Sequence, residues 1–130
     1  MTRIESDKVM VAKPAKAIFE FLSDFNNFEK LMPEQVTNWR STPEECSFTV
    51  AGMASLGMKL IEKTPYSLVK AGKNGSAPFD FTLACQIEDH GEQSQVVLAL
   101  EAELNPMMKM MAERPLTNFI NMLAHKMKTA

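Results

Sequence analysis

The chain is short of the residues on which several classes of protein depend. It has only two cysteines in 130 residues, Cys46 and Cys85, which are too few for a disulfide framework. It also has only two histidines, His90 and His125, and no two of these four residues share a zinc-type spacing. The sequence therefore predicts neither a disulfide-stabilised secreted domain nor a metal site, and it indicates no cofactor.

An excess of charge of either sign is also missing. The chain has 14 lysines and arginines against 16 aspartates and glutamates, a formal net charge of −2. Domains that bind nucleic acid are usually basic, with the basic residues gathered on one face. Here Lys59, Lys63, Lys70 and Lys73 are spread over two neighbouring candidate strands, which is typical of a solvated sheet face. We expect no nucleic-acid partner.

Long hydrophobic runs are absent as well. No stretch approaches the roughly 18 consecutive apolar residues that a membrane-spanning helix needs. Residues 1–8 (MTRIESDK) contain no apolar run after their charges, so we expect no signal peptide. The sequence thus predicts a protein without a membrane span, and the cytoplasm is its expected compartment.

What the chain does have is an ordinary globular composition with many methionines. Hydrophobic residues make up 45% and charged residues 23%, and the length suits a single domain over residues 1–130. Six of the 11 methionines lie in the last 24 residues. Methionine is flexible and fills irregular space, so these residues fit a plain core, which we favour, or the lining of a pocket.

The first 90 residues predict a strand, two short helices and several strands. Residues 3–12 indicate the first strand, and Pro14 begins a helix because proline suits the first helical position. Ser23-Asp24 carries capping chemistry, and a second short helix is expected over 28–32. Alternating or β-branched runs predict further strands at 36–40, 46–50, 58–64 and 67–71.

The clearest pattern is a long antiparallel hairpin. Apolar residues alternate with polar ones over 79–88 and again over 96–104, with the turn residues 89–92 between them. The same alternation places Glu101 and Glu103 on the outer face. One side of this hairpin is therefore expected to face the core.

A long helix should follow the hairpin. Asn105-Pro106 is a favourable helix start, and a helix over 106–128 would be about 35 Å long, about as long as the hairpin strands. Pro115 lies inside the run and predicts a kink or a break near 111–114. One face of the helix gathers apolar residues, with two others beside it: Met108, Met111, Phe119, Leu123 and Met127, flanked by Leu116 and Ile120.

This order of elements indicates an α+β domain with a curved antiparallel sheet of about six to seven strands. Residues 11–24 (VAKPAKAIFEFLSD), 28–33 (FEKLMP) and 104–106 (LNP) resemble the corresponding segments of the START-like, or SRPBCC, superfamily. That superfamily includes polyketide cyclase/dehydrase-like proteins and lipid-transfer domains. The resemblance implies the helix-grip fold, with an apolar cavity between the sheet and the last helix. It implies no catalytic residue, because the superfamily shares no catalytic motif.

No group of residues in the sequence predicts catalysis. Cys46 and Cys85 occupy inward strand positions, where an apolar setting keeps a thiol inert. Both histidines fall at the ends of elements. The glutamates at 44, 45, 101 and 103 are expected in water. Glu62 is open to two positions, one inward near the rim of a pocket and one in water at the end of its strand, and we favour water. Trp39 has two places open to it: the outer face of the sheet, or a site under the loop 41–44.

The remaining candidate site is the cavity between sheet and helix. We expect its lining to come from Phe48, Val50, Met58, Phe79, Phe81, Leu83, Leu98, Leu100, Met108, Met111, Phe119 and Leu123. These side chains are all apolar, which favours binding or carrying of an apolar, lipid- or polyketide-like molecule. Two alternatives stay open. One is a cyclase or dehydratase-like enzyme, which would need a polar group in the cavity. The other is an interaction protein with a filled core, acting through an outer surface near Trp39 or as a homodimer.

Overall fold

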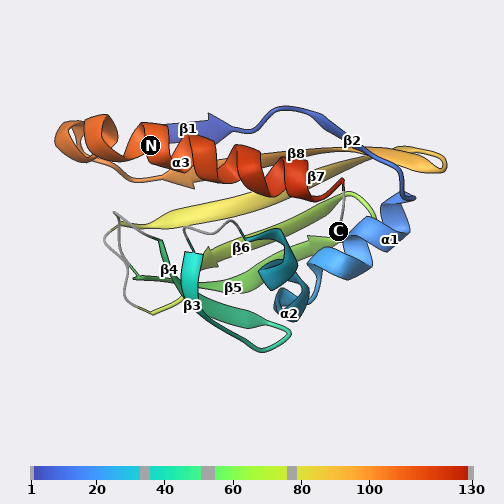
Figure 1. Ribbon diagram of the computed structural model, residues 1–130, viewed down its shortest axis with the longest axis horizontal. Coiled ribbons are helices and arrows are strands. Elements are labelled where there is room, and N and C mark those ends of the chain that lie inside the picture. The colour runs from blue at the N-terminus through green and yellow to red at the C-terminus, as the bar shows by residue number, and fades with distance from the viewer. Residues whose placement is uncertain (1, 33–35, 51–54, 76–78, 129–130) are drawn as a thin grey trace.

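The computed structural model describes residues 2–32, 36–50, 55–75 and 79–128, with the side chain of Val50 left aside. Within these residues, eight strands form one antiparallel sheet, crossed by a long helix near the C-terminus (Figure 1). The strands follow one another in the order β1-β8-β7-β6-β5-β4-β3, and β2 also pairs with β8. The domain therefore has the α+β helix-grip architecture that the sequence predicted.

The predicted hairpin is the centre of the sheet. Strand β7 (Phe81–His90) pairs with β8 (Gln93–Ala102) over its whole length, from Phe81 opposite Ala102 to His90 opposite Gln93. The turn between them needs a positive φ, which Gly91 supplies at 86°. The alternation of buried and exposed residues along β7 confirms that one face of the hairpin packs on the core.

Helix α3 (Pro106–Lys126) follows the hairpin as predicted and lies beside β8 and β1 (Figure 1). Its start is capped by Asn105, whose side chain accepts a hydrogen bond of 2.8 Å from the backbone N–H of Met108. The helix continues through Pro115, so the expected break does not occur. Residues 111–115 are exposed or half-buried, and water can solvate the carbonyl group that proline leaves without a partner.

The first predicted strand is divided in two, which corrects the single strand expected over 3–12. Strands β1 (Thr2–Glu5) and β2 (Val9–Val11) pair with different parts of β8. Between them, the backbone N–H of Leu98 donates to Ser6 Oγ, and the backbone N–H of Ser6 donates to the Leu98 carbonyl, each at 2.8 Å. The Ser6 hydroxyl thus takes the place of a backbone carbonyl, and the chain can leave the regular ladder there.

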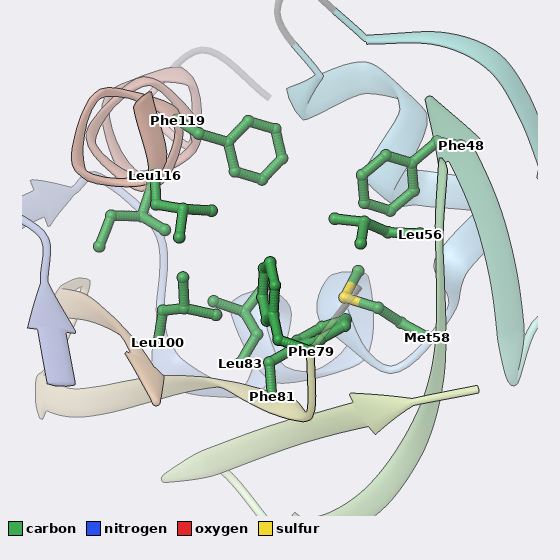
Figure 2. A pocket seen from close by; sticks show the side chains of 10 residues that line it. Phe48, Leu56, Met58, Phe79, Phe81, Leu83, Leu100, Leu116 and Phe119 are labelled. Carbon is green, nitrogen blue, oxygen red and sulfur yellow. The ribbon is translucent and has the colours of Figure 1, made fainter. Parts of the chain in front are cut away.

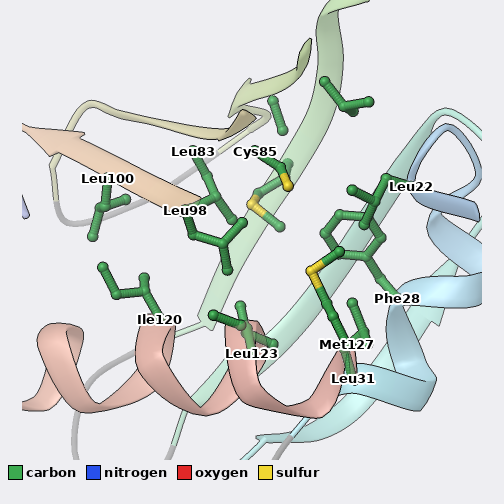
Figure 3. Packing of buried hydrophobic residues seen from close by; sticks show 14 of the residues in the cluster. Leu22, Phe28, Leu31, Leu83, Cys85, Leu98, Leu100, Ile120, Leu123 and Met127 are labelled. Carbon is green, nitrogen blue, oxygen red and sulfur yellow. The ribbon is translucent and has the colours of Figure 1, made fainter. Parts of the chain in front are cut away.

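The short helices close one end of the sheet. Helix α1 (Ala15–Leu22) is followed by α2 (Phe25–Phe28) and the 3₁₀ turn η1 (Glu29–Leu31). Asp24 caps α2 by accepting a hydrogen bond from the backbone N–H of Asn26. The second helix therefore begins three residues earlier than predicted. Figure 3 shows Met127, just after α3, among Leu22, Phe28 and Leu31 of these short helices, so this end of the domain is a packed core.

The other four strands complete the sheet on the far side of the hairpin. They are β3 (Val36–Ser41), β4 (Glu45–Val50), β5 (Ser55–Thr64) and β6 (Leu68–Lys73). The pairing register shifts between Thr37 and Arg40, and again between Leu60 and Glu62. Such bulges bend a strand and increase its twist, and so help the sheet to curve around α3.

Candidate ligand-binding cavity

A cavity lies between α3 and the sheet (Figure 2). Inward-facing residues of β4, β5, β7 and β8, with Phe79 just before β7, form its walls on the sheet side, and successive turns of α3 form the side opposite them. Every side chain that lines it is apolar. The lining comprises Phe48, Leu56, Met58, Phe79, Phe81, Leu83, Leu100, Leu116, Phe119 and Ile120.

The cavity is small as it stands. The space open to the centre of a water-sized sphere is about 20 Å³. That is about the minimum for one water molecule, which would also need two to four polar partners. The described lining residues offer none, and a void of this kind does not favour water. Sites for drug-sized ligands measure roughly 300–1,000 Å³. A ligand of that kind would enter only if lining side chains moved aside.

Seven of the 12 predicted lining residues surround this cavity: Phe48, Met58, Phe79, Phe81, Leu83, Leu100 and Phe119. Leu98 and Leu123 are buried elsewhere in the core, where Leu98 points from β8 toward α3 (Figure 3). Met108 is half-buried and packs against the core outside the cavity lining. Met111 is 73% exposed. The side chain of Val50 lies outside the described residues.

The prediction for Met108 and Met111 is corrected by the way α3 meets the sheet. The buried residues of the helix are Leu116, Ile120, Leu123 and Ala124, at a spacing of i, i+4, i+7 and i+8. None of residues 106–115 is buried. The first turns of α3 thus contribute no fully buried side chain, and the buried face of the helix lies to one side of the predicted face.

Three lining residues were missed: Leu56, Leu116 and Ile120. Leu116 and Ile120 are apolar residues beside the predicted helix face. The helical spacing of 116, 120 and 123 is the signal that places them on the side facing the sheet. Leu56 shares its parity with Met58 but precedes the predicted start of that strand, because β5 begins at Ser55.

A row of aromatic rings borders the cavity on the side of β3. Trp39 stacks on Phe48 with ring centroids 5.4 Å apart, and Phe48 stacks with Phe119 of α3 at 6.2 Å. Trp39 is half-buried against the core, so the outer-face alternative is wrong for this residue. Trp39 lies on the core side because β3 contains a bulge. Asn38 has a φ of 56°, and the register shift around it reverses the side on which Trp39 falls.

The ionisable groups lie away from the cavity lining. Burial raises the pKa of the Cys46 and Cys85 thiols to about 12, so both remain protonated and unreactive near neutral pH. His90 is exposed beside Glu88, and His125 is exposed beside Asp7, each pair at 3.1 Å.

The glutamates singled out in the sequence are also on the surface. Glu44, Glu45, Glu62 and Glu103 are exposed, and the half-buried Glu101 pairs with Arg3 at 3.1 Å. Among the described residues, no three His, Cys, Asp or Glu side chains gather in a way that could hold a metal ion. The chemistry that the described lining supports is apolar contact.

Likeness to other proteins is found in structure rather than in sequence. No protein-family model and no curated protein sequence matches the chain. A START superfamily protein from Mycobacterium smegmatis superposes with a TM-score of 0.70 at 17% identity, covering 98% of this chain and 94% of that one. The di-domain ARO/CYC BexL from the BE-7585A biosynthetic pathway gives a TM-score of 0.68 at 12% identity, over 97% of this chain and 46% of its own.

A third similar structure is norcoclaurine synthase from Thalictrum flavum, in complex with dopamine and hydroxybenzaldehyde. It has a TM-score of 0.72 at 15% identity, over 98% of this chain and 84% of that one. The chain therefore has a START-like fold. Among the described residues, no helix is both long enough and apolar enough to cross a bilayer.

Proposed function

We propose that this START-like domain binds or carries an apolar small molecule, without changing it chemically, in the cavity between α3 and the sheet. The observation that carries the proposal is the lining itself. Nine side chains from four strands and one helix, together with Phe79 just before β7, surround one void, and none of these described side chains presents a polar group to it. A ligand there would gain apolar burial at about 25 cal/mol per Å² of surface removed from water.

The type of lining restricts what could bind. A hydroxyl or amide group placed in this cavity would lose its hydrogen bonds to water and find no replacement, at a cost of about 1–3 kcal/mol. A charged group would cost more. The ligand that fits is therefore apolar over the part that enters, and any polar group it carries stays at the mouth. The similar structure of norcoclaurine synthase, which holds dopamine and hydroxybenzaldehyde, supports the use of this fold for small organic ligands.

Entry of a ligand requires the cavity to widen, and the surroundings favour movement on the helix side. None of residues 106–115 is buried, and Phe119 is only half-buried at the rim. Met58 contributes a flexible side chain to the wall. A modest movement of the first turns of α3, with the side chains of Phe119 and Met58, would enlarge the void. The packed end of the core around Met127 would not need to change.

Two matched substitutions on α3 test the proposal. Leu116 lines the cavity, whereas Leu123 is equally buried on the same helix and does not line it. Leu116→Phe and Leu123→Phe add the same bulk, and each is expected to cost about 1–3 kcal/mol through overpacking. Only the first would fill the site. Binding of the fluorescent apolar probe N-phenyl-1-naphthylamine should weaken at least about tenfold in Leu116→Phe and change little in Leu123→Phe.

The measurement is a fluorescence titration on each variant, at a temperature where circular dichroism shows both to be folded. If both variants bind the probe equally well, the probe does not use this cavity and the proposal is wrong. The same conclusion follows if the wild-type protein fails to bind the probe.

A further inference from the structure

Three methionine side chains form an exposed apolar patch on the first turns of α3. Met107, Met110 and Met111 are 72%, 87% and 73% exposed, whereas the next most exposed large hydrophobic side chains among the described residues are at 48%. Their spacing of i, i+3 and i+4 puts them on one face of the helix. Single exposed apolar residues are ordinary, but three together on one face indicate a contact surface. We call these three residues the methionine patch.

Neither the core nor the cavity requires methionine at these positions. None of residues 106–115 is buried, so the patch contributes little to the packing of the domain. The part of α3 that lines the cavity begins at Leu116. Glutamine and lysine form helices about as well as methionine does, and water would solvate them better here. The apolar character of the patch is therefore explained by a partner rather than by folding.

The electrostatic setting of the patch favours an anionic partner. The first turn of α3, which the structure describes in full, has no acidic side chain, and the positive end of the helix dipole lies there. Between Glu103 and Glu113 the only charged residue is Lys109, whose Nζ lies 4.0 Å from the Glu113 carboxylate. Arg114 is exposed four residues after Met110, and so lies next to it on the helix surface. A cationic side chain thus adjoins the apolar ones.

The size of the patch favours a lipid surface over a second protein. A standard protein–protein interface takes about 800 Å² from each partner. The methionine patch spans little more than one helical turn, and the outward face of α3 continues with the polar, exposed residues Asn118 and His125. A lipid surface needs no such area, because a few apolar side chains beside basic groups give reversible binding. Figure 1 shows the start of α3 at one end of the molecule, where a flat surface can reach it.

We propose that the methionine patch binds the surface of an anionic lipid membrane. The three thioether side chains enter the boundary between headgroups and acyl chains, Arg114 lies among the lipid phosphates, and the helix does not cross the bilayer. This proposal goes beyond the proposed function and does not depend on it, because the patch lies outside the cavity lining. Since that lining begins on the same helix at Leu116, binding would also bring the cavity near a medium in which apolar molecules dissolve.

Co-sedimentation with vesicles, without any added ligand, tests the proposal. Vesicles of phosphatidylcholine with about 30% phosphatidylglycerol should bind the wild-type protein, and vesicles of phosphatidylcholine alone should bind less of it. The triple variant Met107→Gln/Met110→Gln/Met111→Gln keeps side-chain length and helix propensity, and it should bind the mixed vesicles at least about tenfold more weakly. Met10→Gln makes the same change in β2, at a side chain that is 42% exposed, and should bind as the wild type does.

A charge variant separates the electrostatic part of the binding. Arg114→Gln leaves the methionine patch intact and should lower binding to the mixed vesicles about fivefold, as expected for one basic group near an anionic surface. Its binding to vesicles of phosphatidylcholine alone should change little. Circular dichroism on each variant checks that the helix content is unaltered.

Three results would overturn the proposal. The wild-type protein could stay in solution with both kinds of vesicle, which would leave the patch to a protein partner. The triple variant could bind the mixed vesicles as well as the wild type does. Sedimentation equilibrium could show a wild-type dimer that the triple variant converts to a monomer, which would make the patch a contact between two copies.

The same triple variant keeps the two proposals apart. Its substitutions lie outside the cavity lining, so without vesicles it should bind N-phenyl-1-naphthylamine as tightly as the wild-type protein. Loss of vesicle binding with retained probe binding is the result that the methionine patch predicts. Failure of the wild-type protein to bind the probe would count against the cavity and leave the vesicle result standing.

Discussion

Two leucines on neighbouring strands, β7 and β8, offer a direct test of whether the cavity is an unfilled space. Leu83 of β7 and Leu98 of β8 are buried to the same degree, at 5% and 4% exposure, so solvent contact does not distinguish them. Leu83 lines the void and Leu98 does not. Truncating a buried leucine to alanine costs about 2–5 kcal/mol, and the cost depends on how many packing contacts the side chain loses.

A side chain that borders a void has fewer partner atoms on that side. We therefore expect Leu83→Ala to lower the free energy of unfolding by about 2–3 kcal/mol, and Leu98→Ala by about 4–5 kcal/mol, within the usual range for this substitution. Urea unfolding followed by circular dichroism measures both. The reasoning would be refuted if Leu83→Ala cost as much as Leu98→Ala or more, because that result would mean that Leu83 is packed on all sides.

Three other predictions follow from particular contacts. Gly57→Ala would place a methyl group against the backbone carbonyl of Asn74, a residue whose own N–H donates to the Gly57 carbonyl, so urea unfolding should show a loss of about 1–3 kcal/mol. Asn105→Ala removes the cap of α3 and should cost about 1 kcal/mol in the same assay; an unchanged midpoint would show that the cap contributes nothing. Burial raises the pKa of Cys46 and Cys85 from 9.0 to about 12, so their contribution to stability is complete below about pH 9 and declines as the pH rises toward 12. A disulfide reagent for thiols at pH 8 should accordingly modify neither cysteine until the protein is unfolded.

The elements with long, regular patterns could be predicted from the sequence. Buried residues alternate with more exposed ones from Phe81 to Glu88 along β7 and from Gln93 to Leu98 along β8, and the turn between the strands contains Gly91. The start of α3 was marked by Asn105 and Pro106. These signals depend on local periodicity and capping, which tertiary contacts seldom override over such lengths.

Features decided by a single residue could not be predicted in the same way. The bulge at Asn38 reverses the parity of β3, and no repeating pattern in a six-residue strand reveals it. The division between β1 and β2 depends on the Ser6 hydroxyl, which bonds to Leu98 on a strand more than 90 residues away in sequence. The bulge in β3 and the break between β1 and β2 both depend on pairing with a neighbouring strand, so the local sequence alone does not reveal them.

The sequence predicted an apolar site between the sheet and the last helix, but it did not predict all of the residues that line it. Apolar parity placed Leu83 and Leu98 on the same face of the hairpin, and it could not tell which would border a void. That choice depends on the rotation of α3 about its axis, which sets Leu116 and Ile120 against the sheet in place of Met111. Leu116 and Ile120 adjoin the predicted apolar face, and the stripe alone does not say which part of it meets the sheet.

The measurement that tests the central claim most directly is native mass spectrometry of the protein purified gently from its own cells, followed by extraction of any bound compound. The account predicts that the protein carries one apolar molecule, and that this molecule is lost in Leu116→Phe but not in Leu123→Phe. Bare protein from the native source, together with failure to bind N-phenyl-1-naphthylamine, would contradict it.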